Sequence, residues 1–473
     1  MSDIFSLINP FRQTSLKQTL ENNFAKYGNI YKFQTPGNKR FHQVYICDPS
    51  DGEELLRNDG PYPHISGFDF FVAYRSKVRG DLYQGAQGKG LLGSQGPAWQ
   101  EARRFVQQDM MRPRSALFYI DTVDTSSRQL GDLLGRSRGA GDAVVGDLLP
   151  HVYRWALESI TSIFLNTRLG CLDQNPSADT ETLINGANII LGPDMYRLIT
   201  WPPFYKYVEL PYFKRFDRAC SDVYKLCSKY INEAGDKFDR EGGQEGAGDR
   251  ELSVMEKMFV RCGDNRDIPT VMAMDAMMAG VDTTGGAATF LLYHLAANAD
   301  KQELLYREIV DTIGPSTKDV ITEQKLKRMK YLRACAQESH RLKPVATGVS
   351  RRTQAPLVLS GYRVPPGVSV VYTAFLSTNS DSQFPEAAAY RPERWLRGHP
   401  CHHRAHAFSS LPFGHGARMC VGRRFQAPLE LSVLAIRTLQ RFRLHHAGPG
   451  PDLELAFTNR PDRPVNIAFI DRW

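Results

Sequence analysis

The sequence contains little cysteine and no C-x-x-C pair: its eight cysteines are scattered along 473 residues. This spacing argues against a disulfide framework and fits reduced, mostly buried thiols in an intracellular compartment. The sequence also lacks an internal repeat and a secretory signal peptide, and its first 28 residues lack the long apolar run of a signal anchor. We leave two expectations open: the chain is soluble as written, or a targeting segment is absent from it.

The stretch from Thr270 to Ala299 is long enough to span a membrane, but it is not uniformly apolar. It carries Asp275 and Asp282, and a charged group at the middle of a bilayer is costly. We therefore predict that this stretch is a buried helix that crosses a large soluble core.

The composition is that of an ordinary globular protein, with 42% hydrophobic and 23% charged residues. A net charge of +8 suits an anionic membrane surface, an acidic protein partner or nucleic acid, and does not choose among them.

The hydrophobic spacing predicts a mainly α fold with a smaller β part. We expect residues 1–473 to form a single domain, in which a helix-rich core is joined by a minor β region from both ends of the chain. The segment Asp239 to Glu251 is rich in glycine and charge and is expected to be a mobile loop. The expected helices are Asp51 to Arg57, Trp99 to Met111, Pro150 to Arg168, Leu210 to Glu233, Thr270 to Ala299 and a segment from about Gly422; the expected strands lie at Val44 to Ile46, within Leu357 to Val371, and at Val465 to Ile470.

The segment LPFGHGARMCVGRR, Leu411 to Arg424, contains the residue types that an iron-binding cysteine needs. Glycines let the backbone approach a flat macrocycle, and backbone N–H groups at a helix start favour a thiolate. An arginine can pair with a haem propionate, and a phenylalanine can keep water off the sulfur. A buried structural cysteine is the usual explanation for any single cysteine, but five positions together favour the iron ligand: Phe413, Gly416, Arg418, Cys420 and Gly422.

This F-x-x-G-x-R-x-C-x-G pattern resembles that of the cytochrome P-450 family, and the resemblance extends from about Tyr27 to the end of the chain. It implies a single large haem-thiolate fold with a long central helix over haem b. In such a fold Cys420 is the axial ligand of the haem iron, and one oxygen atom of O₂ is inserted into an apolar substrate.

The resemblance also assigns roles to residues far from Cys420. Glu338 and Arg341 form an E-x-x-R motif, and with Arg394 they match the family's buried ion-pair network. Asp282 and Thr283, in the string AGVDTT, match its oxygen-activation motif, in which the acid relays protons and the alcohol holds the iron-bound oxygen. Taken alone, E-x-x-R is usually an exposed helical ion pair, and AGVDTT is usually helix packing.

Three further residues resemble the family's partners for the haem propionates. Trp99 and Arg103 are four residues apart, which puts both side chains on one face of a helix. Arg351 follows shortly after the E-x-x-R helix. Converging cations and donors are a reasonable way to neutralise a buried dianionic cofactor.

Within the family, the chain is most similar to the mitochondrial branch, through segments such as YRWALESIT and MDAMMAGVDTT. That resemblance implies electrons from an acidic [2Fe-2S] ferredoxin, fed by an NADPH-dependent reductase, and a location on the matrix face of the inner mitochondrial membrane. Basic residues would bind the ferredoxin, although a solvated face is the usual explanation of a charge run. The candidates are Lys327, Arg328, Lys330, Arg333, Arg423 and Arg424.

Two departures from the family pattern matter. Gln337 stands where the branch usually has a second lysine, which makes the partner's identity less certain. Pro428, in the string Gln-Ala-Pro, is expected to distort the helix that follows the cysteine loop.

The aromatic and basic stretch from Ile189 to Phe216 resembles the segment that covers the substrate channel and contacts the membrane surface. We expect an apolar, sterol-like substrate, peripheral membrane contact, a monomer and no nucleic-acid partner. A haem-thiolate enzyme that rearranges peroxides or isomers is an alternative, as is a haem-binding sensor without turnover. A zinc site at Cys401, His402, His403 and His406 is disfavoured by their spacing.

Overall fold

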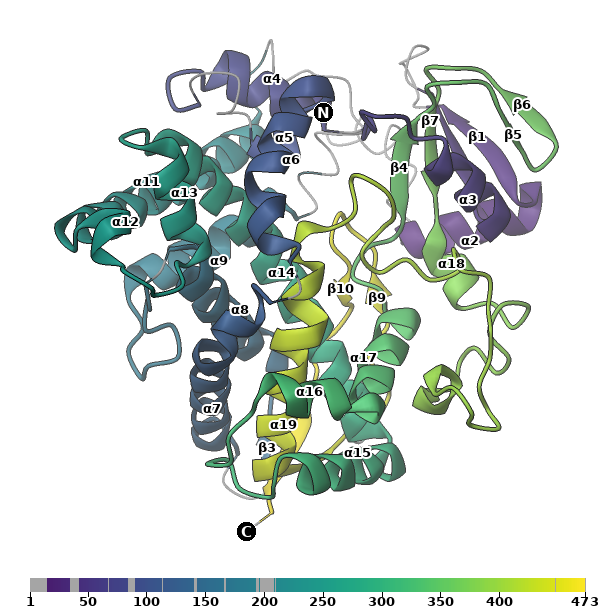
Figure 1. The fold of residues 1–473 in the computed structure, drawn as a ribbon. Coiled ribbons are helices and arrows are strands. Elements are labelled where there is room, and N and C mark those ends of the chain that lie inside the picture. The colour runs from purple at the N-terminus through teal and green to yellow at the C-terminus, as the bar shows by residue number, and fades with distance from the viewer. Residues whose placement is uncertain are drawn as a thin grey trace.

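The structure, a computed structural model, describes residues 15–34, 42–66, 68–83, 90–112, 114–139, 143–165, 167–192, 195, 208, 210–446 and 448–472. It is mainly helical with a small β part, as predicted. In Figure 1 most helices form one large body, and the largest sheet lies at its upper right. Among the described residues, no helix combines the length and apolarity needed to cross a bilayer.

The helical body contains the long predicted helices and several short ones. The α-helices are α2 (Leu16–Tyr27), α3 (Pro49–Arg57), α4 (Asp69–Ala73), α5 (Gly90–Gly93), α6 (Gly96–Met110), α7 (Ile120–Arg136), α8 (Leu148–Phe164), α9 (Ala178–Ile190), α11 (Pro211–Arg240), α12 (Gly243–Gly246), α13 (Val254–Cys262), α14 (Asp267–Ala297), α15 (Ala299–Thr312), α16 (Glu323–Arg328), α17 (Lys330–Leu342), α18 (Ala374–Thr378) and α19 (Ser432–Arg441). Short 3₁₀ and π segments are η1 (Tyr74–Val78), η3 (Leu117–Tyr119), η5 (Pro392–Trp395), η6 (Val421–Arg424) and η7 (Gln426–Leu431).

The strands of the described residues form two sheets and two hairpins. The four-stranded sheet has the order β1-β2-β7-β4, with β2 and β7 parallel and the other pairs antiparallel. The three-stranded sheet, β3-β11-β8, joins the last strand to a strand that precedes α8. Their bounds are β1 (Ile30–Gln34), β2 (His42–Ile46), β3 (Val144–Val145), β4 (Val349–Arg352), β5 (Leu357–Leu359), β6 (Tyr362–Val364), β7 (Ser369–Tyr372), β8 (Phe442–His445), β9 (Leu453–Glu454), β10 (Arg460–Pro461) and β11 (Ile467–Asp471).

Helix α14 runs through the middle of the helical body and is buried over most of its length (Figure 1). Its sequence is apolar on nearly every side, which is typical of a helix enclosed by other helices. Glycines allow α8 to approach α14 closely: a Cβ atom at Gly285 would lie 2.3 Å from Cδ1 of Tyr153, and one at Gly280 would lie 2.9 Å from Cδ1 of Ile160. The sequence of α14 therefore fixes where α8 crosses it.

Two predicted irregular regions can now be compared with the structure. The segment 239–251, predicted to be a loop throughout, instead contains the end of α11 and the short helix α12. Gly242, with φ of +86°, ends α11 and lets the chain start another turn. The distortion expected at Pro428 is confirmed: η7 is a π-helix, in which the N–H of Glu430 donates to the carbonyl of Phe425 at 2.9 Å.

Candidate active site

The cysteine loop is a tight turn held by its own backbone. The N–H of Cys420 donates to the carbonyl of Phe413 at 2.9 Å, and the N–H of Met419 donates to that of Gly416 at 3.1 Å. Gly414 and Gly416 have φ of +69° and +76°, a region that side chains with a Cβ atom rarely adopt. Cys420 then stands at the start of η6, so its sulfur faces the N–H groups of a helix start.

The Cys420 side chain is accessible, yet the surrounding protein is dense. Burial raises the pKa of the Cys420 thiol, whereas the N–H groups of Gly422 and Arg423 and the charge of Arg103 oppose that rise. A bound metal cation is the kind of group that deprotonates such a thiol outright.

Arg103, Arg351 and Arg418 lie in and beside this loop region. They outnumber the acidic side chains that pair with them. Arg351 donates to Asp59 at 2.7 Å, while Arg418 lies 4.2 Å from the centre of the Trp99 ring. Among the described residues, no carboxylate lies within ion-pair distance of Arg103 or Arg418. Burial lowers the pKa of Arg418 to about 9, with the charges of Arg351 and Arg103 adding to the effect.

This donor set fits a dianionic cofactor. Three guanidinium groups against the single carboxylate of Asp59 leave an excess of two positive charges in a mostly buried region. Two carboxylates, such as haem propionates, would balance that excess. The sequence argument did not identify Asp59, because nothing in the sequence connects it to Arg351, which lies 292 residues away.

Helix α14 presents one partly accessible stripe on an otherwise buried surface. The stripe consists of Ala276, Ala279, Gly280 and Thr283, which recur at helical spacing. The Thr283 hydroxyl donates to the carbonyl of Ala279 at 2.6 Å, the back-bonding that a packing role also produces. Ala276, Ala279 and Thr283 carry small side chains on this partly accessible face, whereas Gly280 packs against Ile160 of α8.

Asp282 lies on a different face of α14 from Thr283. Its side chain is buried, with only 7% of the residue exposed, and it accepts a hydrogen bond from the Tyr153 hydroxyl at 2.5 Å. Burial raises the pKa of Asp282, and hydrogen bonds from Tyr153 and Thr458 together with the charge of Arg460 oppose the rise. The sequence did not single out Tyr153 for any role at this acid.

The structure brings Glu338, Arg341 and Arg394 into one buried network. Arg341 donates to both carboxylate oxygens of Glu338, at 2.8 and 2.9 Å, and Arg394 donates to one of them at 2.9 Å. Trp395 adds a donor at 2.8 Å. Each charged group of the network therefore has a hydrogen-bonded partner of opposite charge, which a buried ion pair requires.

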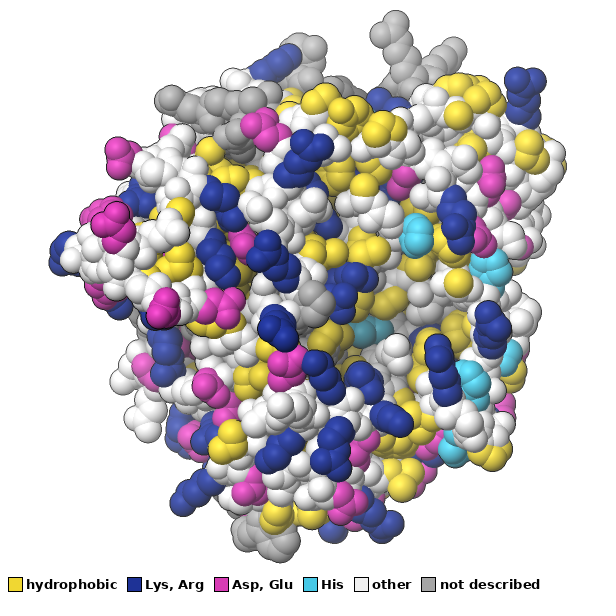
Figure 2. All heavy atoms as spheres, in the orientation of Figure 1, with side chains coloured by type: hydrophobic (Ala, Val, Ile, Leu, Met, Phe, Trp, Pro, Cys, Tyr) yellow, Lys and Arg dark blue, Asp and Glu magenta, His cyan; other side chains and the backbone are white. Residues whose placement is uncertain are grey.

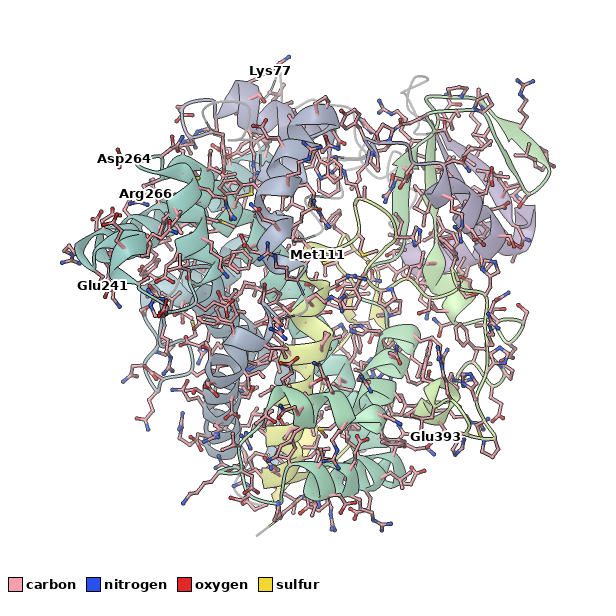
Figure 3. The ribbon with its side chains drawn as sticks, viewed as in Figure 1. Lys77, Met111, Glu241, Asp264, Arg266 and Glu393 are labelled. Carbon is pink, nitrogen blue, oxygen red and sulfur yellow. The ribbon has the colours of Figure 1, made fainter. Side chains whose placement is uncertain are left out.

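The segment η5 carries Arg394 and is tied to two helices beside it. Glu393, labelled at the lower right of Figure 3, accepts from the Tyr331 hydroxyl at 2.9 Å and pairs with Lys301 at 3.0 Å. Because Tyr331 belongs to α17 and Lys301 to α15, the network and its supports join three elements.

A second buried acid lies behind the cysteine loop. Glu430, on η7, is 3% exposed, and burial raises the pKa of its carboxyl to about 7 while a hydrogen bond to Thr284 opposes the rise. Thr284 follows Thr283 on α14, so this contact links the helix after the cysteine to the helix that carries the acid–alcohol pair. The sequence argument missed Glu430, because it treated the region only as a site of distortion.

The candidate docking residues divide into two groups. Four are exposed on α16 and α17: Lys327, Arg328, Lys330 and Arg333. Arg423 and Arg424, on η6, are only partly accessible. Figure 2 shows Lys and Arg side chains gathered over the face that carries α6, α16 and α17.

Other candidate sites have ordinary explanations. His402 and His403 contact the backbone carbonyls of Arg394 and Gln383, and within the described part of the chain no group of three or more side chains is arranged to hold a metal ion. A surface hollow of about 270 Å³ lies between α6 and the start of α14 and does not border Cys420. Most of the predicted channel cover, including residues 196–207, lies outside the described residues.

Fold and site together define a class: a mainly helical protein with an accessible cysteine in a glycine-rich loop, beside arginines in excess of acids. The comparison with protein families gives the class its name. The chain belongs to the cytochrome P450 family, whose model matches residues 4–464. It is accordingly an oxidoreductase of the cytochrome P450 monooxygenase type, and membership of this family implies haem as the cofactor.

Similar proteins occur in flies. "Probable cytochrome P450 12a5, mitochondrial" from Drosophila melanogaster is 32% identical over 469 residues, which cover 94% of this chain and 84% of that protein. "Cytochrome P450 CYP12A2" from Musca domestica is 32% identical, with 90% of this chain and 81% of that protein covered. "Probable cytochrome P450 301a1, mitochondrial" from Drosophila melanogaster is 30% identical, with 93% and 79% covered.

Proposed function

We propose that this monooxygenase binds haem b through Cys420 and inserts one atom of O₂ into an apolar, sterol-like substrate. The observation that carries the proposal is the chemistry around Cys420: a deep but accessible sulfur beside backbone N–H groups, with three arginines and one acid close by. A metal ion bound to the sulfur and a dianionic ring edge would satisfy both features.

The roles of the individual residues follow from their positions. Cys420 would be the axial ligand, with Phe413 and Gly422 beside it in the loop. Trp99, Arg103, Arg351 and Arg418 would hold the propionates. When bound, haem supplies the activation of O₂, and the thiolate favours cleavage of the O–O bond.

Asp282 and Thr283 would handle protons on the distal side. The Thr283 hydroxyl borders the accessible stripe of α14, where it can hold a proton close to a ligand. Asp282 would supply protons to that hydroxyl as a general acid. Glu338, Arg341 and Arg394 would act structurally, by holding α17 against η5 behind the cysteine loop.

We further propose that an acidic [2Fe-2S] ferredoxin, reduced through an NADPH-dependent reductase, delivers the electrons. Support comes from the exposed charges of Lys327, Arg328, Lys330 and Arg333, since complementary charge steers weak, transient encounters. The names of two relatives described above include "mitochondrial", which supports a place in that organelle, on the matrix face of the inner membrane. We expect a monomer that contacts the membrane peripherally.

The test is the absorption spectrum of the reduced, CO-bound protein. The parent protein should give the red-shifted Soret band of thiolate ligation, and Cys420→Ser should lose it. Cys401→Ser is the matched control, because Cys401 is also accessible but lies outside the loop. A purified parent protein that binds no haem, or whose band survives Cys420→Ser, would refute the proposal.

A further inference from the structure

Asp282 is held facing away from the accessible stripe of α14. Its carboxylate receives hydrogen bonds from Tyr153 on α8 and from Thr458, between β9 and β10. Thr283, the next residue, belongs to the stripe, and consecutive residues of a helix point about a quarter turn apart. In this orientation the acid contacts neighbouring elements and not the side of α14 on which Thr283 lies.

The position of Tyr153 is built into the packing of α8 against α14. Its ring lies where a Cβ atom of Gly285 would be, 2.3 Å from Cδ1, and the residue is almost fully buried. Gly285 is three residues after Asp282, so both lie along one face of α14. One face of α14 therefore contacts both parts of Tyr153: the ring packs against Gly285, and the hydroxyl binds Asp282.

Charged groups on the β9–β10 hairpin and before α8 act on this contact. The charge of Arg460, on β10, favours the carboxylate form of Asp282, and Arg460 is paired with Glu454 on β9 at 2.9 Å. The charge of Asp147, which precedes α8, favours the neutral form of the Tyr153 hydroxyl. The hydrogen bond from Tyr153 favours the carboxylate form of Asp282 more strongly than the hydrogen bond from Thr458 or the charge of Arg460 does.

We propose that Tyr153 is a positioning residue for proton delivery: its hydroxyl holds Asp282 in a resting orientation, and Asp282 must leave it before the carboxyl can turn toward Thr283. This inference rests on the proposed function, because it assigns a regulator to the same acid–alcohol pair. Tyr153 does not touch the reacting atoms and acts only through Asp282.

The proposal makes a signed prediction for Tyr153→Phe, which removes one oxygen and keeps the ring. A hydrogen bond to a charged group favours the charged form, so its loss should raise the pKa of Asp282 by about one pH unit. The carboxyl should also become free to turn.

Infrared spectroscopy of the purified protein measures this without turnover, whether or not haem is bound. The carboxylic acid band that disappears in Asp282→Asn identifies the group, and its ionisation is followed with pH. We expect the midpoint to rise by about one pH unit in Tyr153→Phe. Tyr230→Phe is the matched control, since the Tyr230 hydroxyl donates to Asp179 at 2.6 Å in a remote Tyr–Asp pair, and it should leave the midpoint unchanged.

A second readout tests the link to function. In Tyr153→Phe protein with a normal CO-bound spectrum, the alkaline limb of the pH profile for product formation should move upward by the same amount, because a general acid acts in its protonated form. A midpoint that does not move overturns the proposal, and so does a moved midpoint with an unchanged pH profile. If Tyr153→Phe does not fold, Thr458→Val removes the other hydrogen bond and should raise the midpoint in the same direction. Failure of the proposed function would appear separately, as an absent thiolate band or absent turnover, while the infrared midpoint stays measurable.

Discussion

Glu430 allows a quantitative test of the packing behind the cysteine loop. Burial raises the pKa of its carboxyl from 4.5 to about 7 in the folded protein. Between these two pH values the unfolded chain loses the proton while the folded protein keeps it, so stability falls as pH rises. The difference in pKa corresponds to about 3 kcal/mol, reached above about pH 7.

Glu430→Gln should remove this pH dependence, because glutamine has nearly the same shape and does not ionise. Relative to the parent protein, the variant should gain about 3 kcal/mol of unfolding free energy between pH 4.5 and pH 8. Urea unfolding midpoints of both proteins across that range measure the gain, and their difference cancels the other titrating groups.

Glu256→Gln is a control of opposite sign. Burial alone would raise the pKa of Glu256, but hydrogen bonds from Arg250 and Ser253 lower it below its ordinary value. Its contribution to stability is therefore present above the unfolded pKa and is lost as pH falls. If the difference between Glu430→Gln and the parent protein were constant from pH 4.5 to 8, the carboxyl of Glu430 would not be protonated by burial, and our reasoning would be wrong.

Three further predictions concern other parts of the site. Glu338→Gln leaves two buried arginines without a carboxylate and should cost about 3–5 kcal/mol, seen as a lower unfolding midpoint; a loss below about 1 kcal/mol would contradict the network's role. Gly285→Ala forces a Cβ atom into the tyrosine ring packed there and should cost about 1–3 kcal/mol, whereas Gly286→Ala, whose nearest contacts are at 3.5 Å, should be tolerated; equal effects would refute this account. Lys330→Glu and Arg333→Glu should slow reduction by ferredoxin several-fold at low salt and less at high salt; rates indifferent to charge and salt would move the docking face elsewhere.

The sequence predicted features whose parts lie close together in the chain. The cysteine loop is visible because five residues of one pattern occur within ten positions, and α14 is visible because the stretch from Thr270 to Ala299 is long and mostly apolar. The contact between Glu338 and Arg394, 56 residues apart, was assigned only through family resemblance. Periodicity describes one element at a time and does not say which elements meet.

The features that the sequence did not reveal depend on tertiary contacts. Tyr153 and Asp282 are 129 residues apart, and nothing in the sequence links the tyrosine to the acid, because their contact depends on where α8 crosses α14. Asp59 belongs to the site only because it pairs with Arg351, which lies on a strand of the main sheet. Segment 239–251 was wrongly predicted to be a loop throughout, because glycine can end one helix and permit a short second one.

The π-helix η7 gives the chain a local tolerance to changes in length. A π-turn contains one more residue than an α-turn. It is therefore equivalent to a single residue inserted into an α-helix. Removing one residue there, such as Pro428, would tighten the turn to α geometry while Cys420 and α19 kept their places. A deletion of one residue after Cys420 could thus be accommodated without shifting the elements on either side of η7.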